Sequence, residues 1–221
     1  MFDNIAHRYD FLNHFLSLGI DIYWRKKAIA FLSAFQPKII MDMATGTGDF
    51  AFEALSLKPE KIIAYDLSLG MIERGRIKSK EKGVSNIVEF IKGDSEKMPF
   101  EENQFDAMTV GFGVRNFENL EQGLSEMLRV LKPNGKLVVL EIAKPRNPLI
   151  TPIFKLYFHY IAPGIGRLFS KDHRAYTYLP ESVAAFPEGD DFIRILNRVG
   201  FKNAQYNPLT FGICAMYTCE K

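Results

Sequence analysis

Short apolar runs that alternate with helical patterns organise most of the chain. Five such runs predict strands, at residues 38–43, 61–66, 88–94, 105–110 and 136–140. Between them, apolar residues recur three or four positions apart, most clearly over residues 120–131, and this spacing predicts helices. Strands that alternate with helices predict a mostly parallel sheet with helices on both faces. Such sheets bind ligands at the carboxyl ends of their strands.

The C-terminal tail departs from this alternation. Residues 191–199 predict a helix that ends at Gly200, and residues 203–207 and 213–219 predict two strands joined by a short link with a proline. A closing antiparallel hairpin fits this order better than another parallel unit. The predicted fold class is therefore α/β, Rossmann-like, with a mostly parallel seven-stranded sheet and a C-terminal antiparallel hairpin.

One domain is predicted for residues 1–221, because 47% hydrophobic and 13% aromatic residues supply one large core at this chain length. Within it we expect a ligand-binding core at residues 37–143 and a closing helix and hairpin at residues 191–221. Residues 1–36 are predicted to form an N-terminal helical cover over the active face. Residues 144–190 are predicted to form a helical insert or lid.

Composition limits the classes of binding partner and the cellular compartment that are expected for the chain. The chain has 28 Lys and Arg against 26 Asp and Glu, a net charge of +2, so nothing in the balance favours a nucleic-acid partner. Cys214 and Cys219 have an odd spacing in a predicted strand, which points their side chains to opposite faces. They cannot pair with each other, and a reducing cytoplasm is the expected compartment.

No membrane span or signal peptide is predicted. The N-terminus lacks a basic stretch followed by an apolar run. The longest apolar region, residues 148–169, is interrupted by prolines, a glycine and charged residues and falls short of a span of roughly 20 residues. Its aromatic side chains predict peripheral contact with lipid or with a lipophilic substrate tail instead. These are Phe154, Tyr157, Phe158, Tyr160 and Phe169.

A glycine-rich turn follows the first predicted strand. In the run from Asp42 to Gly48, Gly46 and Gly48 stand where the backbone turns sharply and approaches a ligand. Asp66 ends the second strand about 20 residues later, where a carboxylate can bind a ribose diol. These features alone fit either NAD or S-adenosylmethionine.

Three features favour S-adenosylmethionine. The negative charge of Asp42 beside the turn suits the ammonium of a methionine moiety and would repel a pyrophosphate. Asp94 and Ser95, at the end of the third strand, can accept from an adenine amino group. Third, residues 129–135, together with the closing hairpin, resemble the class I methyltransferase domain. The alternative is that Asp66 and Asp94 only cap the helices that follow them.

Motifs along nearly the whole chain resemble the quinone-biosynthesis C-methyltransferase family, which methylates menaquinone and ubiquinone precursors. They are RYDFLN from Arg8, LSLG from Leu16, WR at Trp24, FGVRN from Phe112, LEI from Leu140, YLPES from Tyr178 and LTFGI from Leu209. Two departures stand out. Members usually carry Gly-Gly-Thr-Gly where this chain has the run from Ala44 to Gly48, and they begin further upstream than Met1. The second departure suggests a trimmed N-terminus.

The resemblance implies an enzyme that uses S-adenosylmethionine to methylate a carbon of a prenylated quinol, with demethylmenaquinol as the expected acceptor. It carries over Thr47, Asp66, Asp94 and Ser95 as cofactor-binding positions. Gly111 stands where some relatives have serine, so its contact would use the backbone. Enzymes of this kind need no metal, and the four histidines are scattered along the chain.

Carbon methylation of a quinol is helped by a group that stabilises the phenolate. Arg115 is the leading candidate, because it follows the fourth strand at the ligand edge. The alternative for Arg115 is a salt bridge that holds the loop at Asn116. Tyr9 and Tyr178 are further catalytic candidates, as proton acceptors or ring-binding groups.

Other functions stay open at this point. An NAD-dependent oxidoreductase would share the glycine turn and Asp66, and a module that binds the cofactor without catalysis would share every motif. Another small lipophilic acceptor would fit the same core. Trp24 and residues 153–169 would line an entry for the prenyl chain, or pack under a lid.

Overall fold

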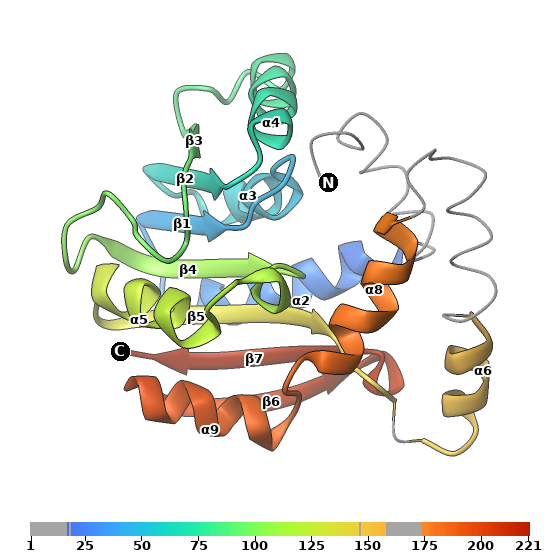
Figure 1. Ribbon diagram of the computed structural model, residues 1–221. Coiled ribbons are helices and arrows are strands. Elements are labelled where there is room, and N and C mark those ends of the chain that lie inside the picture. Colours follow the sequence, from blue (N-terminus) through green and yellow to red (C-terminus); the bar gives the residue numbers. More distant parts are fainter. Residues whose placement is uncertain (1–16, 18, 146, 158–173) are drawn as a thin grey trace.

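A seven-stranded sheet forms the centre of the protein in a computed structural model that describes residues 17, 19–145, 147–157 and 174–221 (Figure 1). The strand order is β3-β2-β1-β4-β5-β7-β6. Strands β1 to β5 pair in parallel, and β7 pairs antiparallel with both β5 and β6. The predicted mostly parallel sheet with a closing antiparallel hairpin is confirmed.

The strand bounds agree with the apolar runs to within a few residues. The strands are β1 Ile39–Met43, β2 Lys61–Asp66, β3 Val88–Lys92, β4 Phe105–Gly111, β5 Leu131–Ile142, β6 Lys202–Leu209 and β7 Cys214–Glu220. Strand β5 begins at Leu131, before the strand predicted at residues 136–140. Leu131 pairs with Phe105, and the register then shifts so that Ala107 pairs with Lys136. The intervening residues bulge out of the strand, with Asn134 in a left-handed conformation.

Helices cover the sheet on both faces. They are α2 Ile20–Ser33, α3 Asp49–Ala54, α4 Leu69–Glu81, α5 Leu120–Val130, α6 Ile150–Leu156, α8 Arg174–Ala185 and α9 Asp190–Val199. Buried residues of α2, α3 and α4 pack on one face, and those of α5 and α9 pack on the other. Figure 1 shows α5 and α9 in front of the sheet and α2 behind it.

Helix α2 lies within residues 1–36, which are predicted to form an N-terminal helical cover. Its Trp24, Ala28, Ile29 and Leu32 are buried against the sheet. The reason is their spacing, which places all four on one side of a helix that begins at Ile20. α2 is therefore a core layer.

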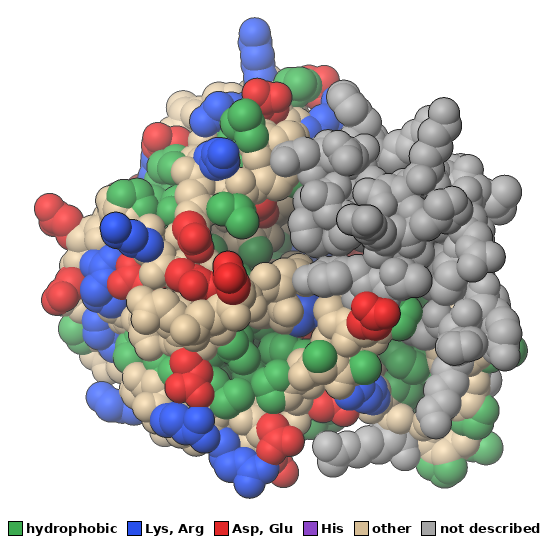
Figure 2. Space-filling view, in the orientation of Figure 1, with side chains coloured by type: hydrophobic (Ala, Val, Ile, Leu, Met, Phe, Trp, Pro, Cys, Tyr) green, Lys and Arg blue, Asp and Glu red, His purple; other side chains and the backbone are tan. Residues whose placement is uncertain are grey.

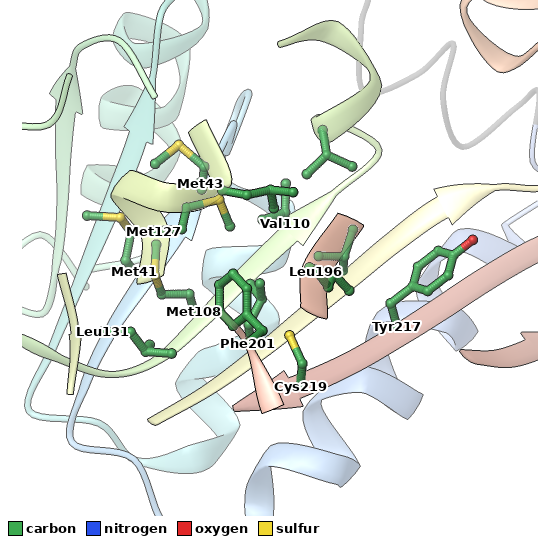
Figure 3. Close-up of a cluster of buried hydrophobic side chains, with 14 of the residues drawn as sticks. Met41, Met43, Met108, Val110, Met127, Leu131, Leu196, Phe201, Tyr217 and Cys219 are labelled. Atoms are coloured by element: carbon green, nitrogen blue, oxygen red, sulfur yellow. The ribbon is translucent and has the colours of Figure 1, made fainter. Parts of the chain in front are cut away.

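The core has a methionine-rich half, in which Met41, Met43, Met108 and Met127 lie together (Figure 3). Methionine side chains adapt to irregular space between a twisted sheet and its helices. Cys219 belongs to this half and Cys214 to the opposite one, and both are free thiols. The prediction that the two cysteines point to opposite faces is confirmed.

The surface agrees with the charge balance. Figure 2 shows basic and acidic side chains interspersed over the described part of the visible face, without a broad basic area. Among the described residues, no helix is long and apolar enough to cross a membrane.

Candidate functional site

The parallel strands β1, β2, β3 and β4 end at one edge of the sheet, and the predicted ligand residues follow these ends. Met43 pairs with Tyr65 of β2 and with Val110 of β4, so the loops after these three strands are neighbours. The structure brings together the glycine turn, Asp66 and Gly111 at this edge. The arrangement is the one that sheets of this class use for ligands.

The glycine turn requires left-handed backbone at several positions. Gly46 has φ 56° and Gly48 has φ 93°, conformations that residues with a Cβ rarely adopt. A Cβ at Gly48 would also lie 2.5 Å from the ring of Phe90. Ala44 has φ 51°, and its methyl group lies where a Cβ on Gly113 would clash. The turn and the loop after β4 are therefore closely packed.

Ala44→Gly is expected to raise the free energy of unfolding by about 1 kcal/mol, because glycine relieves the strain of a left-handed alanine. Ala107→Gly in β4 is the control, because Ala107 does not have a positive φ. In this variant glycine relieves no strain, so the free energy of unfolding should fall. Urea unfolding of both variants checks the prediction. A loss of stability in both variants would contradict it.

Asp42 lies beneath the turn and has no exposed surface. Its Oδ2 accepts from the Thr45 hydroxyl at 2.5 Å and from the backbone N–H of Ala51 at 3.1 Å, and its Oδ1 accepts from the Thr109 hydroxyl at 2.6 Å. These three hydrogen bonds join Asp42 to the turn, to α3 and to β4, so the carboxylate supports the turn from below. The predicted effect of its charge on a ligand ammonium stays a prediction.

Burial raises the pKa of the Asp42 carboxyl from the ordinary 3.8 to about 6, although its hydrogen bonds oppose the shift. The folded state thus keeps a proton that the unfolded chain releases. The stabilisation is complete below pH 4 and is lost as pH rises through 6, an effect of roughly 3 kcal/mol. Between pH 4 and 7 the unfolding free energy of the wild type should therefore fall relative to that of Asp42→Asn, which has no carboxyl group to titrate at this position. Parallel profiles would exclude this effect.

Asp66 joins the glycine turn to the start of α4. Its Oδ2 accepts from the backbone N–H of Gly46 at 2.8 Å, and its Oδ1 accepts from that of Ser68 at 2.8 Å. The helix cap of α4 is Ser68, which accepts from the N–H of Met71. The alternative in which Asp66 is the cap of this helix is therefore wrong. The carboxylate is partly exposed at the ligand edge.

Asp94 and Ser95 follow β3 at the same edge. Asp94 is exposed, and its Oδ1 accepts from the N–H of Glu96 at 2.9 Å. The element that follows Asp94 is strand β4 and not a helix, so the capping alternative fails here as well. Leu67, directly after Asp66, is 66% exposed.

Thr47 is buried in the turn and accepts a hydrogen bond from Lys78 Nζ at 3.1 Å. Lys78 also forms an ion pair of 2.6 Å with Asp49. Sequence reasoning missed Lys78. It lies 31 positions from Thr47, and no local sequence pattern predicts a contact over this separation. Gly111 ends β4 beside α3, where a Cβ would lie 3.0 Å from the Phe50 ring.

Arg115 lies in a short 3-10 helix, η3 (Val114–Asn116), after β4. Its Nη1 lies 2.7 Å from the buried carboxylate of Glu141 and 2.5 Å from the carbonyl oxygen of Phe112. Glu141 also accepts from the Arg115 backbone N–H. Arg115 Nε is buried and has no hydrogen-bond partner among the described residues. The arginine is thus held in one orientation and keeps one unused donor.

The remaining catalytic candidates are less well described. Tyr9 lies outside the described residues. Tyr178 lies on α8, which packs beside η3, but its side chain is outside the described set. Phe158, Tyr160 and Phe169 of the predicted lipid contact are also outside it. Among the described residues, no cluster of His, Cys, Asp or Glu could hold a metal ion.

Known proteins resemble this chain along its full length. Residues 1–221 match the model of the ubiE/COQ5 methyltransferase family. Over 222 residues the chain is 51% identical to the demethylmenaquinone methyltransferase of Bacteroides fragilis, covering 100% of this chain and 91% of the relative. It is 44% identical to the ubiquinone/menaquinone biosynthesis C-methyltransferase UbiE of Geotalea daltonii, covering 100% and 94%.

Solved structures share the fold at low sequence identity. A protein of Methanococcus maripaludis that is named a putative S-adenosyl-L-methionine-dependent methyltransferase superposes with a TM-score of 0.67 at 17% identity, covering 100% of this chain and 94% of the other. A SAM-dependent methyltransferase of Aquifex aeolicus gives 0.60 at 19% identity, covering 82% and 81%. These two likenesses concern the fold alone.

Proposed function

The chain belongs to the ubiE/COQ5 methyltransferase family and is a S-adenosylmethionine-dependent methyltransferase, and we propose that it methylates a ring carbon of demethylmenaquinol to give menaquinol. The observation that supports demethylmenaquinol as the acceptor is the 51% identity, over the whole chain, to a relative named demethylmenaquinone methyltransferase. A relative named for both quinones, at 44% identity, makes a ubiquinone precursor the second candidate.

We propose that the ligand edge holds the cofactor through four groups of residues. Asp66 binds the ribose, Asp94 and Ser95 bind the adenine, and the turn carrying Gly46, Thr47 and Gly48 approaches the methionine part. Gly111 contributes its backbone. Asp66 fits this cofactor, because its partly exposed carboxylate lies beside the glycine turn and can accept hydrogen bonds from ribose hydroxyls. When bound, the cofactor supplies a methyl group on a positively charged sulfur.

Arg115 is proposed to stabilise the acceptor's developing phenolate. Glu141 and the Phe112 carbonyl fix Nη1, so the planar guanidinium is oriented before the acceptor arrives. Its buried Nε is the donor that no described residue uses. Tyr9 and Tyr178 remain proposed as groups that accept the hydroxyl proton or bind the ring. Arg115 then lowers the free energy of the charged ring from which the carbon attacks in line.

Methyl transfer from labelled S-adenosylmethionine tests the acceptor. Demethylmenaquinol is expected to be methylated with a higher kcat/KM than a benzoquinol precursor of ubiquinone, both with short prenyl chains. A preference for the benzoquinol would overturn the menaquinone assignment.

Peripheral contact with a lipid surface is also proposed, because the acceptor carries a prenyl chain. Leu149 and Leu156, at the two ends of α6, are 78% and 56% exposed, and α6 lies beyond the carboxyl end of β5 (Figure 1). Exposed leucines at this edge can enter the boundary of a bilayer. Phe154 of the same helix is only partly exposed, so the two leucines are the better test.

Leu149→Ser/Leu156→Ser is expected to bind phosphatidylglycerol vesicles about a hundredfold more weakly, since each leucine contributes roughly 1.5–3 kcal/mol when it is fully buried. Vesicle sedimentation measures this binding. Ile77→Ser on α4 is the control, because Ile77 is 47% exposed on a different part of the surface. Equal sedimentation of both variants and the wild type would contradict lipid contact through α6.

A further inference from the structure

Trp24, in the first half of α2, connects two loops at the ligand edge. Its indole N–H donates to the Thr210 hydroxyl at 2.7 Å, in the turn between β6 and β7. Its ring centroid lies 5.9 Å from that of Phe112, in the loop after β4. Because β5 and β6 both pair antiparallel with β7, β6 ends at the same edge as the parallel strands. Trp24 is 5% exposed, so little water competes for these contacts.

Both loops contain non-glycine residues with left-handed backbone. Phe112 has φ 58°, Thr210 has φ 47° and Phe211 has φ 57°. This conformation is unfavourable for aromatic and β-branched residues and persists only where the surroundings hold it. At Phe112, the holding contacts are the Trp24 ring and the hydrogen bond from the Phe112 N–H to the Leu140 carbonyl at 2.7 Å. Strain that is held in this way is typical of positions that orient a functional group.

The functional group next to Phe112 is the Arg115 guanidinium. The Phe112 carbonyl oxygen accepts from Arg115 Nη1, and the left-handed backbone at Phe112 sets the direction of this carbonyl. The other group on Nη1 is the carboxylate of Glu141, which is buried in β5. A shift of Phe112 would therefore turn the guanidinium about its contact with Glu141 and move the Nε donor.

We propose that Trp24 is a positioning residue for Arg115. Anchored by Thr210, it holds Phe112 in the strained conformation that sets the direction of the guanidinium. The proposal rests on the catalytic role proposed above for Arg115, and Trp24 itself makes no contact with the acceptor. Position matters at this scale, because a displacement of about 1 Å can lower the rate of a reaction by about a hundredfold.

Thr210→Val removes the acceptor of the indole N–H and keeps a β-branched side chain. It is expected to lower kcat about tenfold, while KM for demethylmenaquinol and the dissociation constant of S-adenosylhomocysteine stay unchanged. Thr210→Ser retains the hydroxyl and should restore kcat. Tyr217→Phe is the matched control and should leave kcat unchanged. It also removes a hydroxyl that accepts from an N–H at 2.7 Å, that of Gly189, but in the opposite half of the core.

Trp24 is the only tryptophan in the sequence, so its fluorescence reports this contact independently of activity. Loss of a hydrogen bond from an indole N–H shifts the emission to shorter wavelength. This shift is expected in Thr210→Val but not in Thr210→Ser or Tyr217→Phe. An unchanged emission in Thr210→Val would contradict the anchoring of Trp24 and overturn the proposal.

A double variant shows whether Trp24 acts through Arg115. Thr210→Val should lower kcat no further in Arg115→Lys, because the group that it orients is already absent. An equal loss in both backgrounds, or a normal kcat in Thr210→Val when Arg115→Lys is impaired, would overturn the proposal. A normal kcat in Arg115→Lys would contradict the catalytic role of Arg115 and, with it, this proposal. With the benzoquinol as the preferred acceptor the same kcat ratios are expected, so an error in the acceptor stays separate from an error about Trp24.

Discussion

Arg115→Lys is expected to lower kcat by between about tenfold and a thousandfold while leaving the affinity for S-adenosylhomocysteine unchanged. A lysine places a point charge on a flexible stem where the arginine offers a rigid planar group. In the structure, one nitrogen of that group is held by Glu141 and the Phe112 carbonyl. A lysine that pairs with Glu141 has no second nitrogen to present to the acceptor. Turnover per folded molecule is the measurement.

Arg115 could instead serve a structural role through its ion pair with Glu141, and the same variant tests this alternative. Breaking a buried pair by removing one partner costs roughly 3–5 kcal/mol, whereas lysine retains the charge and should lower the melting temperature only modestly. Near-normal turnover with a lowered melting temperature would make Arg115 a structural residue and leave Tyr9 and Tyr178 as the candidates. Arg129→Lys is the control. Arg129 forms a two-nitrogen pair with Glu126 in the last turn of α5, where that helix leads into β5.

Asp66→Ala is expected to weaken S-adenosylhomocysteine binding at least tenfold. The reason is the loss of charge-assisted hydrogen bonds to the ribose, which contribute about 1.5–3 kcal/mol each. The same substitution removes the acceptor for the N–H groups of Gly46 and Ser68, so part of the loss would come from a loosened turn. Calorimetric titration and melting temperature must therefore be measured on the same preparation.

Two further variants separate the ribose contact from the turn. Asp66→Asn keeps one oxygen for a backbone N–H but loses the charge, so it should recover stability more than affinity. Asp106→Ala is the matched control, because Asp106 accepts from the N–H groups of Lys38 and Ile39 at the start of β1. It should lower stability without changing affinity. An unchanged dissociation constant in folded Asp66→Ala would remove Asp66 from the cofactor site.

Local patterns were sufficient for most of the sheet and for the position of the ligand edge. The second strand was predicted with its observed bounds at residues 61–66, because β-branched and apolar residues in a short run fit a buried strand. The glycine turn was readable because left-handed backbone favours glycine, as at Gly46 and Gly48. For α2, the spacing of apolar residues predicts a buried side but not the surface that buries it.

The amino-acid sequence alone determined the α/β alternation, the closing hairpin, the glycine turn and the acids that end the strands, since each depends on neighbours along the chain. The tertiary structure decided which groups these residues touch. Thr109 donates to Asp42 from 67 positions away, and Lys78 reaches Thr47 from 31 positions away. Such contacts arise from strand order and from the packing of helices on the sheet. Sequence spacing carries neither, so the buried charge of Asp42 and the hydrogen bond from Lys78 to the turn emerged only once the sheet was assembled.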